Sequence, residues 1–324
     1  AETSFGSSSL YVEKWLIKPR HIEFQILADQ HGNTIHLGER ECSIQRKYQK
    51  LIEETPSPVV DEEKRKEIGE LAVKAAEAAK YINAGTVEFL RDQQGNFYFL
   101  EMNTRLQVEH LITEMVTGVD IVKWQIRIAA DEPLDIAQEE VEMRGTAIDC
   151  RINAEDPRRD FMPCPGTVSR FHPPGGPGVR VDTALYTGCT IPVYYDSLIA
   201  KLAVWGADRT EAIRRMQNAL NEIVIEGVET TIPLLKGIIG HPDFQKAQIH
   251  VQFVDEKLRE LLPAEAGPTP EELAALAVVV ATKLGGRRAT PTINRVQASA
   301  AGVSMWKAYG RWRLLQFRFM RGWA

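Results

Sequence analysis

Apolar residues recur at two different spacings along the first half of the chain. Alternation of apolar and polar residues over 11–40, with Val12 and Trp15 among its apolar members, predicts strands separated by a turn at 29–33. Apolar residues at helical spacing from Ile68 to Ala79 instead predict a helix. The elements expected in this half are strands within 11–40, a helix over 61–81, a hairpin of 86–90 and 97–101, and a mostly helical stretch over 111–130.

A proline and several acidic residues within 131–141 indicate a boundary, after which a second module begins. Asp208 is placed to cap a helix over 209–223. Strands are expected in this module at 146–152, 166–171, 179–182 and 197–204. A proline-rich linker at 263–270 and helices over 271–284 and 304–320 close the chain. The sequence therefore predicts an α+β protein with three parts, 1–140, 141–262 and 263–324.

The composition is that of a folded protein. Of the 324 residues, 44% are hydrophobic and 26% are charged, which excludes disorder over most of the chain. No apolar run approaches the roughly 20 residues that a transmembrane helix needs, and the N-terminus shows no signal-peptide pattern. Four widely separated cysteines form neither a zinc-binding spacing nor a disulfide framework. A reducing, cytoplasmic location is therefore expected.

Charge is distributed unevenly along the chain. Removing the basic residues of the C-terminal tail from the net charge of −5 leaves −14 for residues 1–282. Such a tail suits the acidic body of the same chain, a sister subunit, another acidic partner or a membrane surface. Nucleic acid is not expected, because no recognition motif accompanies the charge. The tail has no acidic residue and nine basic ones: Lys283, Arg287, Arg288, Arg295, Lys307, Arg311, Arg313, Arg318 and Arg321.

The predicted hairpin brings two acidic residues together. With its turn centred near residues 94–95, Glu88 is expected to face Glu101 across the two strands. Two facing carboxylates repel each other unless a cation neutralises them. Asn103 adds an amide oxygen, and this set of oxygen ligands suits Mg²⁺. The hairpin is therefore either a metal site or a solvated acidic edge.

The loop that follows the hairpin favours the metal site. Arg105, Gln107 and Glu109 alternate, so they share one face of an extended segment. A guanidinium matches a small oxyanion, an amide adds a donor, and a carboxylate can act as a base. The loop therefore places an anion clamp and a base beside the candidate metal ligands.

Two other polar segments are less specific. Residues 43–50 carry alternating basic side chains, which either contact an anion or belong to a solvated strand. Arg151, at the end of a predicted strand, either reaches a cleft or pairs with Asp149 or Glu155. Neither pattern decides a function by itself.

Several segments are specific enough to compare with known families: Glu13–Leu16, Pro19–His21, Glu39–Arg46, Glu101–His110, Cys150–Pro157 and Tyr194–Ser197. Together they resemble biotin carboxylase, the ATP-grasp component of acetyl-CoA, propionyl-CoA and pyruvate carboxylases. The resemblance covers about residues 1–260 and leaves out the tail. It implies the C-terminal portion of an ATP-grasp domain, an antiparallel sheet with helices, followed by the biotin carboxylase C-terminal α+β domain.

The resemblance implies a role for each residue of the candidate site. Glu109 would deprotonate bicarbonate, and Arg151 would stabilise the biotin enolate. Tyr48 stands where bacterial members usually carry His, which weakens the case for it as an ATP contact. The implied nucleotide contacts are Glu13, Lys14, Trp15, Leu16, His21, Gln45 and Leu90; the implied Mg²⁺ (or Mn²⁺) ligands are Glu88, Glu101 and Asn103; and the implied bicarbonate contacts are Lys50, Arg105, Gln107 and the backbone of Val108.

The implied activity is ATP- and bicarbonate-dependent carboxylation of biotin through carboxyphosphate. The implied partners are a biotin carboxyl carrier protein and a carboxyltransferase subunit, while dimerisation and the final carboxyl acceptor stay open. In a complete family member an N-terminal domain and most of the ATP-grasp lid would precede Ala1, so this chain alone is expected to bind ATP poorly and turn over little. The alternatives are a non-catalytic scaffold subunit that keeps the fold, and another ATP-grasp ligase such as a carbamoyl phosphate synthetase.

Overall fold

The structure is a computed structural model that describes residues 2–10, 12–263, 274–275 and 277–278. The chain divides into two compact units, residues 1–265 and 266–324. The elements given below all lie in the first unit. The predicted helices over 271–284 and 304–320 fall outside the described residues, apart from 274–275 and 277–278.

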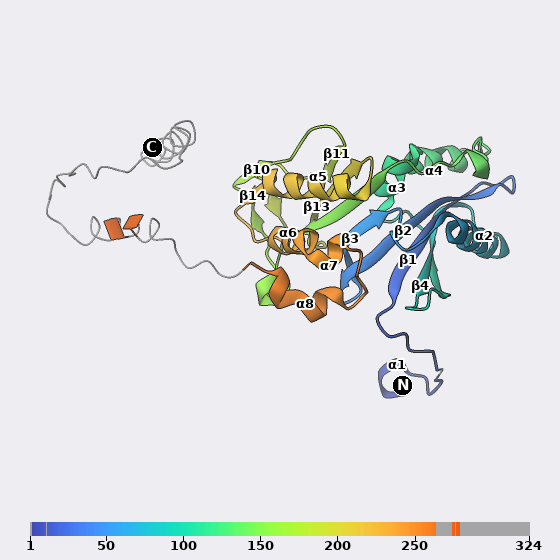
Figure 1. Cartoon of the computed structure of the whole chain (residues 1–324), viewed down its shortest axis with the longest axis horizontal. Helices are drawn as coiled ribbons and strands as arrows, with labels where there is room; N and C mark the ends of the chain where they lie inside the picture. The colour runs from blue at the N-terminus through green and yellow to red at the C-terminus, as the bar shows by residue number, and fades with distance from the viewer. Residues whose placement is uncertain (1, 11, 264–273, 276, 279–324) are drawn as a thin grey trace. The chain divides into compact units, whose positions relative to one another are not determined.

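One eight-stranded sheet runs through the first unit (Figure 1). Its order is β11-β13-β6-β3-β2-β1-β4-β5, and each neighbouring pair is antiparallel. The two strands of the predicted hairpin therefore lie at one end of the sheet, with β5 as the edge strand and β4 beside it. The strands are β1 (Arg20–Ala28), β2 (Thr34–Arg46), β3 (Gln49–Thr55), β4 (Asn83–Arg91), β5 (Phe97–Asn103), β6 (Thr146–Asn153), β11 (Val179–Thr183) and β13 (Leu198–Gly206).

Helices and short strands complete the unit. The short strands form three two-stranded ribbons, β7 (Glu155–Asp156) with β8 (Met162–Pro163), β9 (Gly166–Thr167) with β12 (Thr190–Ile191), and β10 (Arg170–His172) with β14 (Val224–Glu226). The helices are α1 (Glu2–Phe5), α2 (Glu62–Ala78), α3 (His110–Thr117), α4 (Ile121–Ala129), α5 (Arg209–Glu222), α6 (Ile232–Gly240), α7 (Pro242–Gln245) and α8 (Phe253–Leu261). Within the part of the chain that the structure describes, every helix is too short or too polar to cross a membrane.

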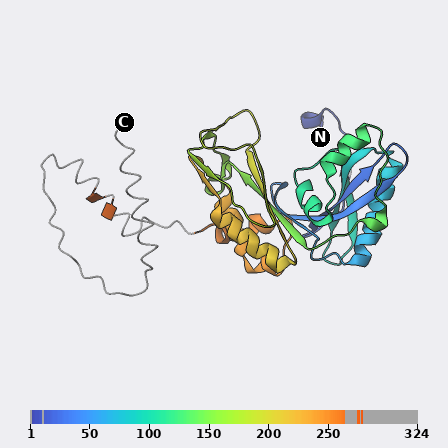
Figure 2. The same ribbon diagram turned by 90° about the horizontal axis from the view of Figure 1, so that it is seen from above.

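Helices cover both faces of the sheet around β1 (Figure 2). α2 packs Ile68 and Ala72 against Phe24 on one face. α4 packs Trp124 against Leu27 on the other face. Phe24 and Leu27 are three positions apart on one strand, so their side chains point in opposite directions.

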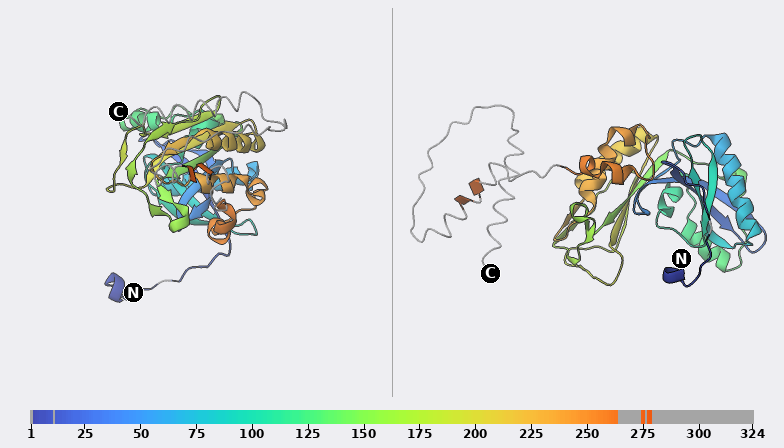
Figure 3. Two further views of the ribbon diagram at one scale, coloured as in Figure 1. Left: turned by 90° about the vertical axis from the view of Figure 1, so that its left-hand side faces the viewer. Right: turned by 90° about the horizontal axis from the view of Figure 1, so that it is seen from below.

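The strands β6 and β13 carry apolar residues on one face and charged residues on the other. Cys150 and Leu202 pack in the core formed with α5, α6 and α8, and Figure 3 shows these yellow and orange helices gathered on one side of the green strands. The alternate residues Asp149, Arg151 and Lys201 point to the opposite face. Alternation along two paired strands thus separates the core from a polar face.

Two sequence predictions are confirmed in detail. Asp208 caps α5, as predicted, by accepting a hydrogen bond from the backbone N–H three residues on. Asp61, which was not predicted as a cap, caps α2 in the same way. The hairpin forms with Glu88 directly opposite Glu101.

One prediction about the first half is wrong. Residues 12–19 form no strand, and Val12 and Trp15 are 98% and 79% exposed. Alternation alone does not make a strand when the segment finds no neighbour to pair with. The stretch 111–130 is mostly helical, as predicted. It forms two helices, because Gly118 ends α3 in a left-handed conformation, with φ 74°.

The basic stretch 43–50 is also not a single strand. Lys47 and Tyr48 form a turn in which both residues have positive φ, and the chain reverses there from β2 into β3. This turn brings Gln45 and Lys50 opposite each other across the hairpin.

The expected boundary at 131–141 lies between strands of the same sheet. β3, which precedes it, pairs with β6, which follows it, through partners such as Ile52 and Cys150. The polar face beside this pairing contains the candidate site.

Candidate active site

A cavity of about 810 Å³ opens on the polar face of the sheet. Residues from before and after the 131–141 segment line it. Every residue that the sequence placed in the site lies in this lining except Glu13. Those lining residues are Lys14, Trp15, Leu16, His21, Gln45, Lys50, Glu88, Leu90, Glu101, Asn103, Arg105, Gln107, Val108, Glu109 and Arg151.

Three acidic side chains follow one another across adjacent strands on this face. Glu23 of β1 pairs in register with Glu88 of β4, which pairs with Glu101 of β5. Glu23 and Glu88 are buried, at 0% and 4% exposure. Like charges in this arrangement require cations nearby.

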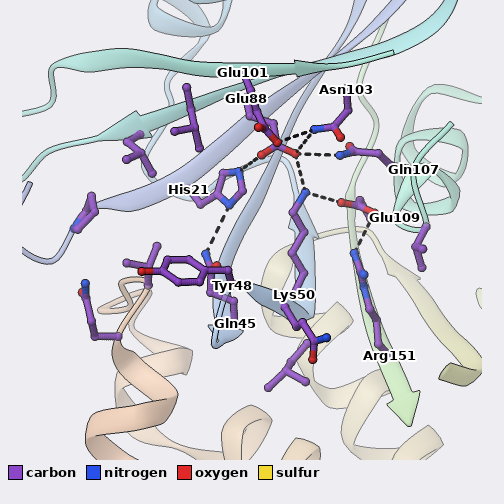
Figure 4. Close-up of a pocket in the computed structure, with 18 of the residues that line it drawn as sticks. His21, Gln45, Tyr48, Lys50, Glu88, Glu101, Asn103, Gln107, Glu109 and Arg151 are labelled. Carbon is purple, nitrogen blue, oxygen red and sulfur yellow. Dashed lines mark hydrogen bonds and ion pairs between the residues drawn. The ribbon is translucent and has the colours of Figure 1, made fainter. Parts of the chain in front are cut away.

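Lys50 supplies the central cation (Figure 4). Its ammonium group contacts Glu23, lies 3.1 Å from Glu88 Oε1 and lies 2.6 Å from Glu109 Oε1. Burial lowers the pKa of Lys50, but the charges of Glu23 and the other carboxylates outweigh that effect and raise the pKa well above its usual range. Lys50 is therefore a permanent cation in the middle of the acidic cluster.

The two innermost acids stay ionised. Burial raises the pKa of Glu23, but Lys50 and Arg40 outweigh burial and lower it to about 2. Burial also raises the pKa of Glu88, whereas the hydrogen bond from His21 and the charge of Lys50 bring it well below the usual range. His21 Nε2 lies 2.8 Å from Glu88 Oε2.

Glu109 is held at both of its oxygens. Lys50 binds Oε1, and a terminal nitrogen of Arg151 donates to Oε2 at 2.9 Å. Glu109 is 2% exposed and directly precedes the first residue of α3. The carboxylate is thus fixed in orientation at the wall of the cavity, as a positioned base requires.

Glu88, Glu101 and Asn103 fit the donor set of a magnesium ion. The Asn103 amide nitrogen donates to Glu88 Oε1 at 2.9 Å and to Glu101 Oε1 at 3.2 Å, so oxygens of both carboxylates converge on one amide end. Rotating the amide by half a turn would present its oxygen at that point instead. Three oxygens around one point match a hard divalent cation.

Arg105 lies at the rim with few contacts. Its guanidinium donates to the Leu106 carbonyl at 3.3 Å and to Asn103 Oδ1 at 3.4 Å, and the side chain is exposed. Gln107 is buried, and its amide donates to Glu88 Oε1 at 2.8 Å. The loop therefore presents an accessible guanidinium next to a fixed amide.

Apart from Glu13, the residues that the resemblance assigns to nucleotide binding lie in the opposite part of the cavity. Lys14 Nζ donates to the Tyr98 hydroxyl at 2.8 Å, and Gln45 Nε2 lies 3.4 Å from His21 Nδ1. Tyr48 also lines the cavity, with 92% of its surface exposed. Glu13 is exposed and outside the lining, and its contact with nucleotide stays a prediction.

Four charged residues that support the site were not predicted as part of it: Glu23, Arg40, Glu53 and Asp149. All four are 0% exposed. Arg40 donates to Glu23 Oε1 at 2.6 Å, and Glu53 accepts from Arg151 Nε at 2.6 Å. Their signal in the sequence is the alternation of the strands that carry them, but charged residues at alternating positions also suit a solvent-facing side of a sheet.

Comparisons with known proteins agree with this arrangement. Residues 1–137 match the family model for the carbamoyl-phosphate synthase L chain, ATP binding domain, and residues 149–256 match that for the biotin carboxylase C-terminal domain. The biotin carboxylase of Nostoc sp. is 57% identical over 256 residues, which are 79% of this chain and 57% of that protein. Biotin carboxylase 1 of Bacillus subtilis is 54% identical over 256 residues, again 79% of this chain and 57% of that protein.

A solved structure is similarly close. The biotin carboxylase domain dimer of Hydrogenobacter thermophilus 2-oxoglutarate carboxylase, in complex with MgADP, ADP and bicarbonate, has a TM-score of 0.78 and 52% identity, covering 82% of this chain and 58% of that chain. These matches and the site together define an ATP-grasp protein. The chain belongs to the biotin carboxylase family. It spans little more than half the length of the relatives it matches.

Proposed function

We propose that the chain provides the catalytic core of a biotin carboxylase, which uses ATP and bicarbonate to carboxylate biotin carried on a biotin carboxyl carrier protein. The observation that carries this proposal is the Glu109 carboxylate, fixed between Lys50 and Arg151 in the cavity that also holds the Glu88–Asn103–Glu101 oxygens. A base, an anion site and a metal-ligand set in one cavity are what bicarbonate phosphorylation requires.

Lys50, Arg105, Gln107 and the backbone of Val108 would hold bicarbonate within reach of Glu109. Glu109 then removes the bicarbonate proton, and the resulting oxygen attacks the γ-phosphoryl group of ATP, releasing ADP and giving carboxyphosphate. Magnesium held by Glu88, Glu101 and Asn103 would neutralise phosphate charge. The chain's own part in this step is to orient two anions that would otherwise repel each other.

The second step transfers the carboxyl group. Carboxyphosphate breaks into CO₂ and phosphate, phosphate takes the ureido N–H proton of biotin, and the biotin nitrogen then attacks CO₂. Arg151 would hold the negative oxygen of the biotin enolate, because its charge is permanent and its burial strengthens the interaction. Burial lowers the pKa of Arg151, but Glu53 and Glu109 outweigh burial and raise it above its usual range.

This function implies two partners, a biotin carboxyl carrier protein and a carboxyltransferase subunit. We also propose pairing with a second copy of the chain, because the related domain of Hydrogenobacter thermophilus forms a dimer. The final carboxyl acceptor stays open. Because the chain spans little more than half of its relatives, the activity is proposed for a protein that contains their full length, and weak turnover by the 324-residue chain alone stays a prediction.

The decisive experiment restores the length of the relatives. The chain would be fused to the N-terminal segment of the Nostoc sp. protein and assayed for ATP- and bicarbonate-dependent carboxylation of free biotin. Activity is expected, and Glu109→Gln is expected to lower kcat by about 10²–10⁴-fold through loss of the base. Glu54→Gln is the matched control. Glu54 is a buried glutamate of β3 that pairs with Arg209 away from the cavity.

An inactive but folded fusion would argue for a scaffold subunit instead. A fusion that keeps full activity with Glu109→Gln would show that the base has been assigned wrongly.

A further inference from the structure

Two acidic side chains lie behind Arg151 with no part in the proposed reaction. Glu53 of β3 and Asp149 of β6 are direct partners in the antiparallel pairing, and both are 0% exposed. The Cβ atoms of such partners lie about 4.5–5.5 Å apart. The two carboxyl groups therefore face each other beneath the cavity.

Glu53 fixes the guanidinium of Arg151 from behind. Arg151 Nε donates to Glu53 Oε1 at 2.6 Å, and a terminal nitrogen lies 2.6 Å from the same oxygen. The same terminal nitrogen, Nη2, also donates to Glu109 Oε2 at 2.9 Å, the contact that Figure 4 shows. Glu53 thus sets the direction in which Arg151 presents its donors.

Three oxygens of the two acids have no hydrogen-bond partner among residues 2–10, 12–263 and the four described positions beyond them. They are Glu53 Oε2 and both carboxyl oxygens of Asp149. Burying an ionised carboxylate without a donor is strongly unfavourable. A proton on one of the two acids removes one charge and supplies the missing donor.

Asp149 is the acid that takes this proton. Lys50 contacts Glu23, Glu88 and Glu109. Arg151 contacts Glu53. No lysine or arginine of the described residues bonds to Asp149, on which Arg151 and Lys201 act through space alone. Burial and then the charge of Glu53 raise the pKa of Asp149 well above its usual range.

Glu53 lies in the same buried surroundings as Asp149, but it has a cation, Arg151, in direct contact. Burial raises its pKa to about 7 against the opposing charge of Arg151, and the charge of Glu109 adds to the effect of burial. Because Arg151 bonds directly to Glu53, the carboxylate form belongs to Glu53 and the acid form to Asp149.

We propose that Glu53 and Asp149 share one proton, carried by Asp149, and that the pair positions Arg151. The protonated Asp149 donates its O–H to Glu53 Oε2, so Glu53 keeps its negative charge toward Arg151. The pair then presents one negative charge instead of two, and the guanidinium stays directed toward Glu109 and a substrate oxyanion. The effect of the pair on the reaction rests on the proposed function. The sharing of a proton between Glu53 and Asp149 does not.

The test uses the 324-residue chain and three variants. Asp149→Asn keeps a neutral donor opposite Glu53. Glu53→Gln removes the anchor of Arg151. Glu54→Gln is the matched control, since Glu54 is the neighbouring glutamate on β3, is 1% exposed and pairs with Arg209.

Two readouts report on the pair without turnover. An infrared difference spectrum at pH 7 between the parent chain and Asp149→Asn should show loss of one protonated-carboxyl band, which Glu54→Gln retains. Hydrogen exchange of the Arg151 Nε–H, followed by ¹⁵N NMR, should accelerate at least tenfold in Glu53→Gln and stay within about twofold in Asp149→Asn and Glu54→Gln.

The proposal is overturned if the parent chain lacks the protonated-carboxyl band at pH 7, or if Asp149→Asn releases the Arg151 Nε–H as much as Glu53→Gln does. Failure of the proposed function is a separate result, because it would appear as an inactive fusion protein while the infrared and exchange signatures of the pair persist.

Discussion

Arg40 is the largest side chain buried completely in the described part of the protein. All of its donor groups are used, by Glu23, Gln25, Thr86, Thr113 and Gln107. Its bond to Gln107 Oε1 turns the amide of Gln107 so that the nitrogen meets Glu88. A residue outside the cavity lining thus orients the side chains that we expect to contact substrate.

Removing Arg40 should leave the buried carboxylate of Glu23 with one cationic partner, Lys50, in place of two. Arg40→Met is expected to lower the free energy of unfolding by about 3–5 kcal/mol, because Glu23 and its neutral neighbours lose their donors. Urea unfolding measures the change. Arg144→Met, which removes an exposed arginine paired with Glu142, should leave the midpoint nearly unchanged, and an equal loss in both variants would contradict the prediction.

Because of Asp149, the free energy of unfolding should fall as pH rises. Its pKa is raised in the folded chain, so the folded state binds a proton that the unfolded state has released. The stability it contributes is complete below the ordinary pKa of about 3.9, and it is lost as pH rises toward the raised folded pKa at about 1.4 kcal/mol per pH unit.

Asp149→Asn should remove this slope. The variant is expected to be more stable than the parent at pH 7, and the difference in the free energy of unfolding is expected to be smaller at pH 5. Urea midpoints at the two pH values measure the difference. A parent chain that becomes more stable relative to the variant as pH rises would show that Asp149 is ionised when folded.

Part of the site could be predicted from residue types and spacing alone. The position of the turn predicts that Glu88 faces Glu101. The alternation of Arg105, Gln107 and Glu109 predicts that these three side chains share one face. Glu53 and Asp149 could not be found in that way, because a charged residue at an alternating position has the same pattern whether it faces water or a buried partner. Only the pairing of β3 with β6 brings those two together.

At the scale of elements, close backbone packing decides what the sequence tolerates. A Cβ at Gly237 of α6 would lie 1.8 Å from the Leu261 carbonyl oxygen at the end of α8. A contact this short with backbone forces the two helices apart. The glycine is therefore needed for α6 and α8 to pack as they do.

Gly237→Ala should destabilise the protein by about 1–3 kcal/mol or more, because the added methyl group overpacks the helix contact. Gly240→Ala in the same helix is the control, since a Cβ there meets nothing within 4 Å, and it should leave stability unchanged or raise it slightly. Thermal unfolding distinguishes the two, and a Gly237→Ala chain as stable as the control would refute the packing argument.

Element boundaries follow the sequence where a local signal exists. Asp61 and Asp208 each start a helix, and Gly118 ends one, because capping and left-handed geometry depend on nearby residues alone. Residues 12–19 show the limit of such signals. Their alternation resembles that of β1, but a strand also needs a partner, and this segment has none among the described residues.

At the scale of the whole first unit, one sheet joins the segments that match two different family models. The pairing of β3 with β6 runs directly beneath the cavity, and Arg151 from the later segment bonds to Glu53 and Glu109 from the earlier one. The two segments should therefore unfold together.

Native-state hydrogen exchange should report the same opening free energy for the paired amides of β3 and β6. The expected agreement is within about 0.5 kcal/mol, because neither strand can open without exposing the other. Amides of the β10–β14 ribbon, which lies outside the main sheet, serve as the comparison. Exchange of β6 at a clearly lower free energy than β3 would show that the segments open separately.

The shared sheet also bears on attempts to divide the protein for study. A cut near residue 140 respects both family models, yet it would leave β3 and β6 each with a row of unsatisfied backbone donors and acceptors. Unpaired edges of this kind recruit strands from other molecules. Halves produced separately should aggregate. Halves produced in the same cell can instead pair β3 of one half with β6 of the other.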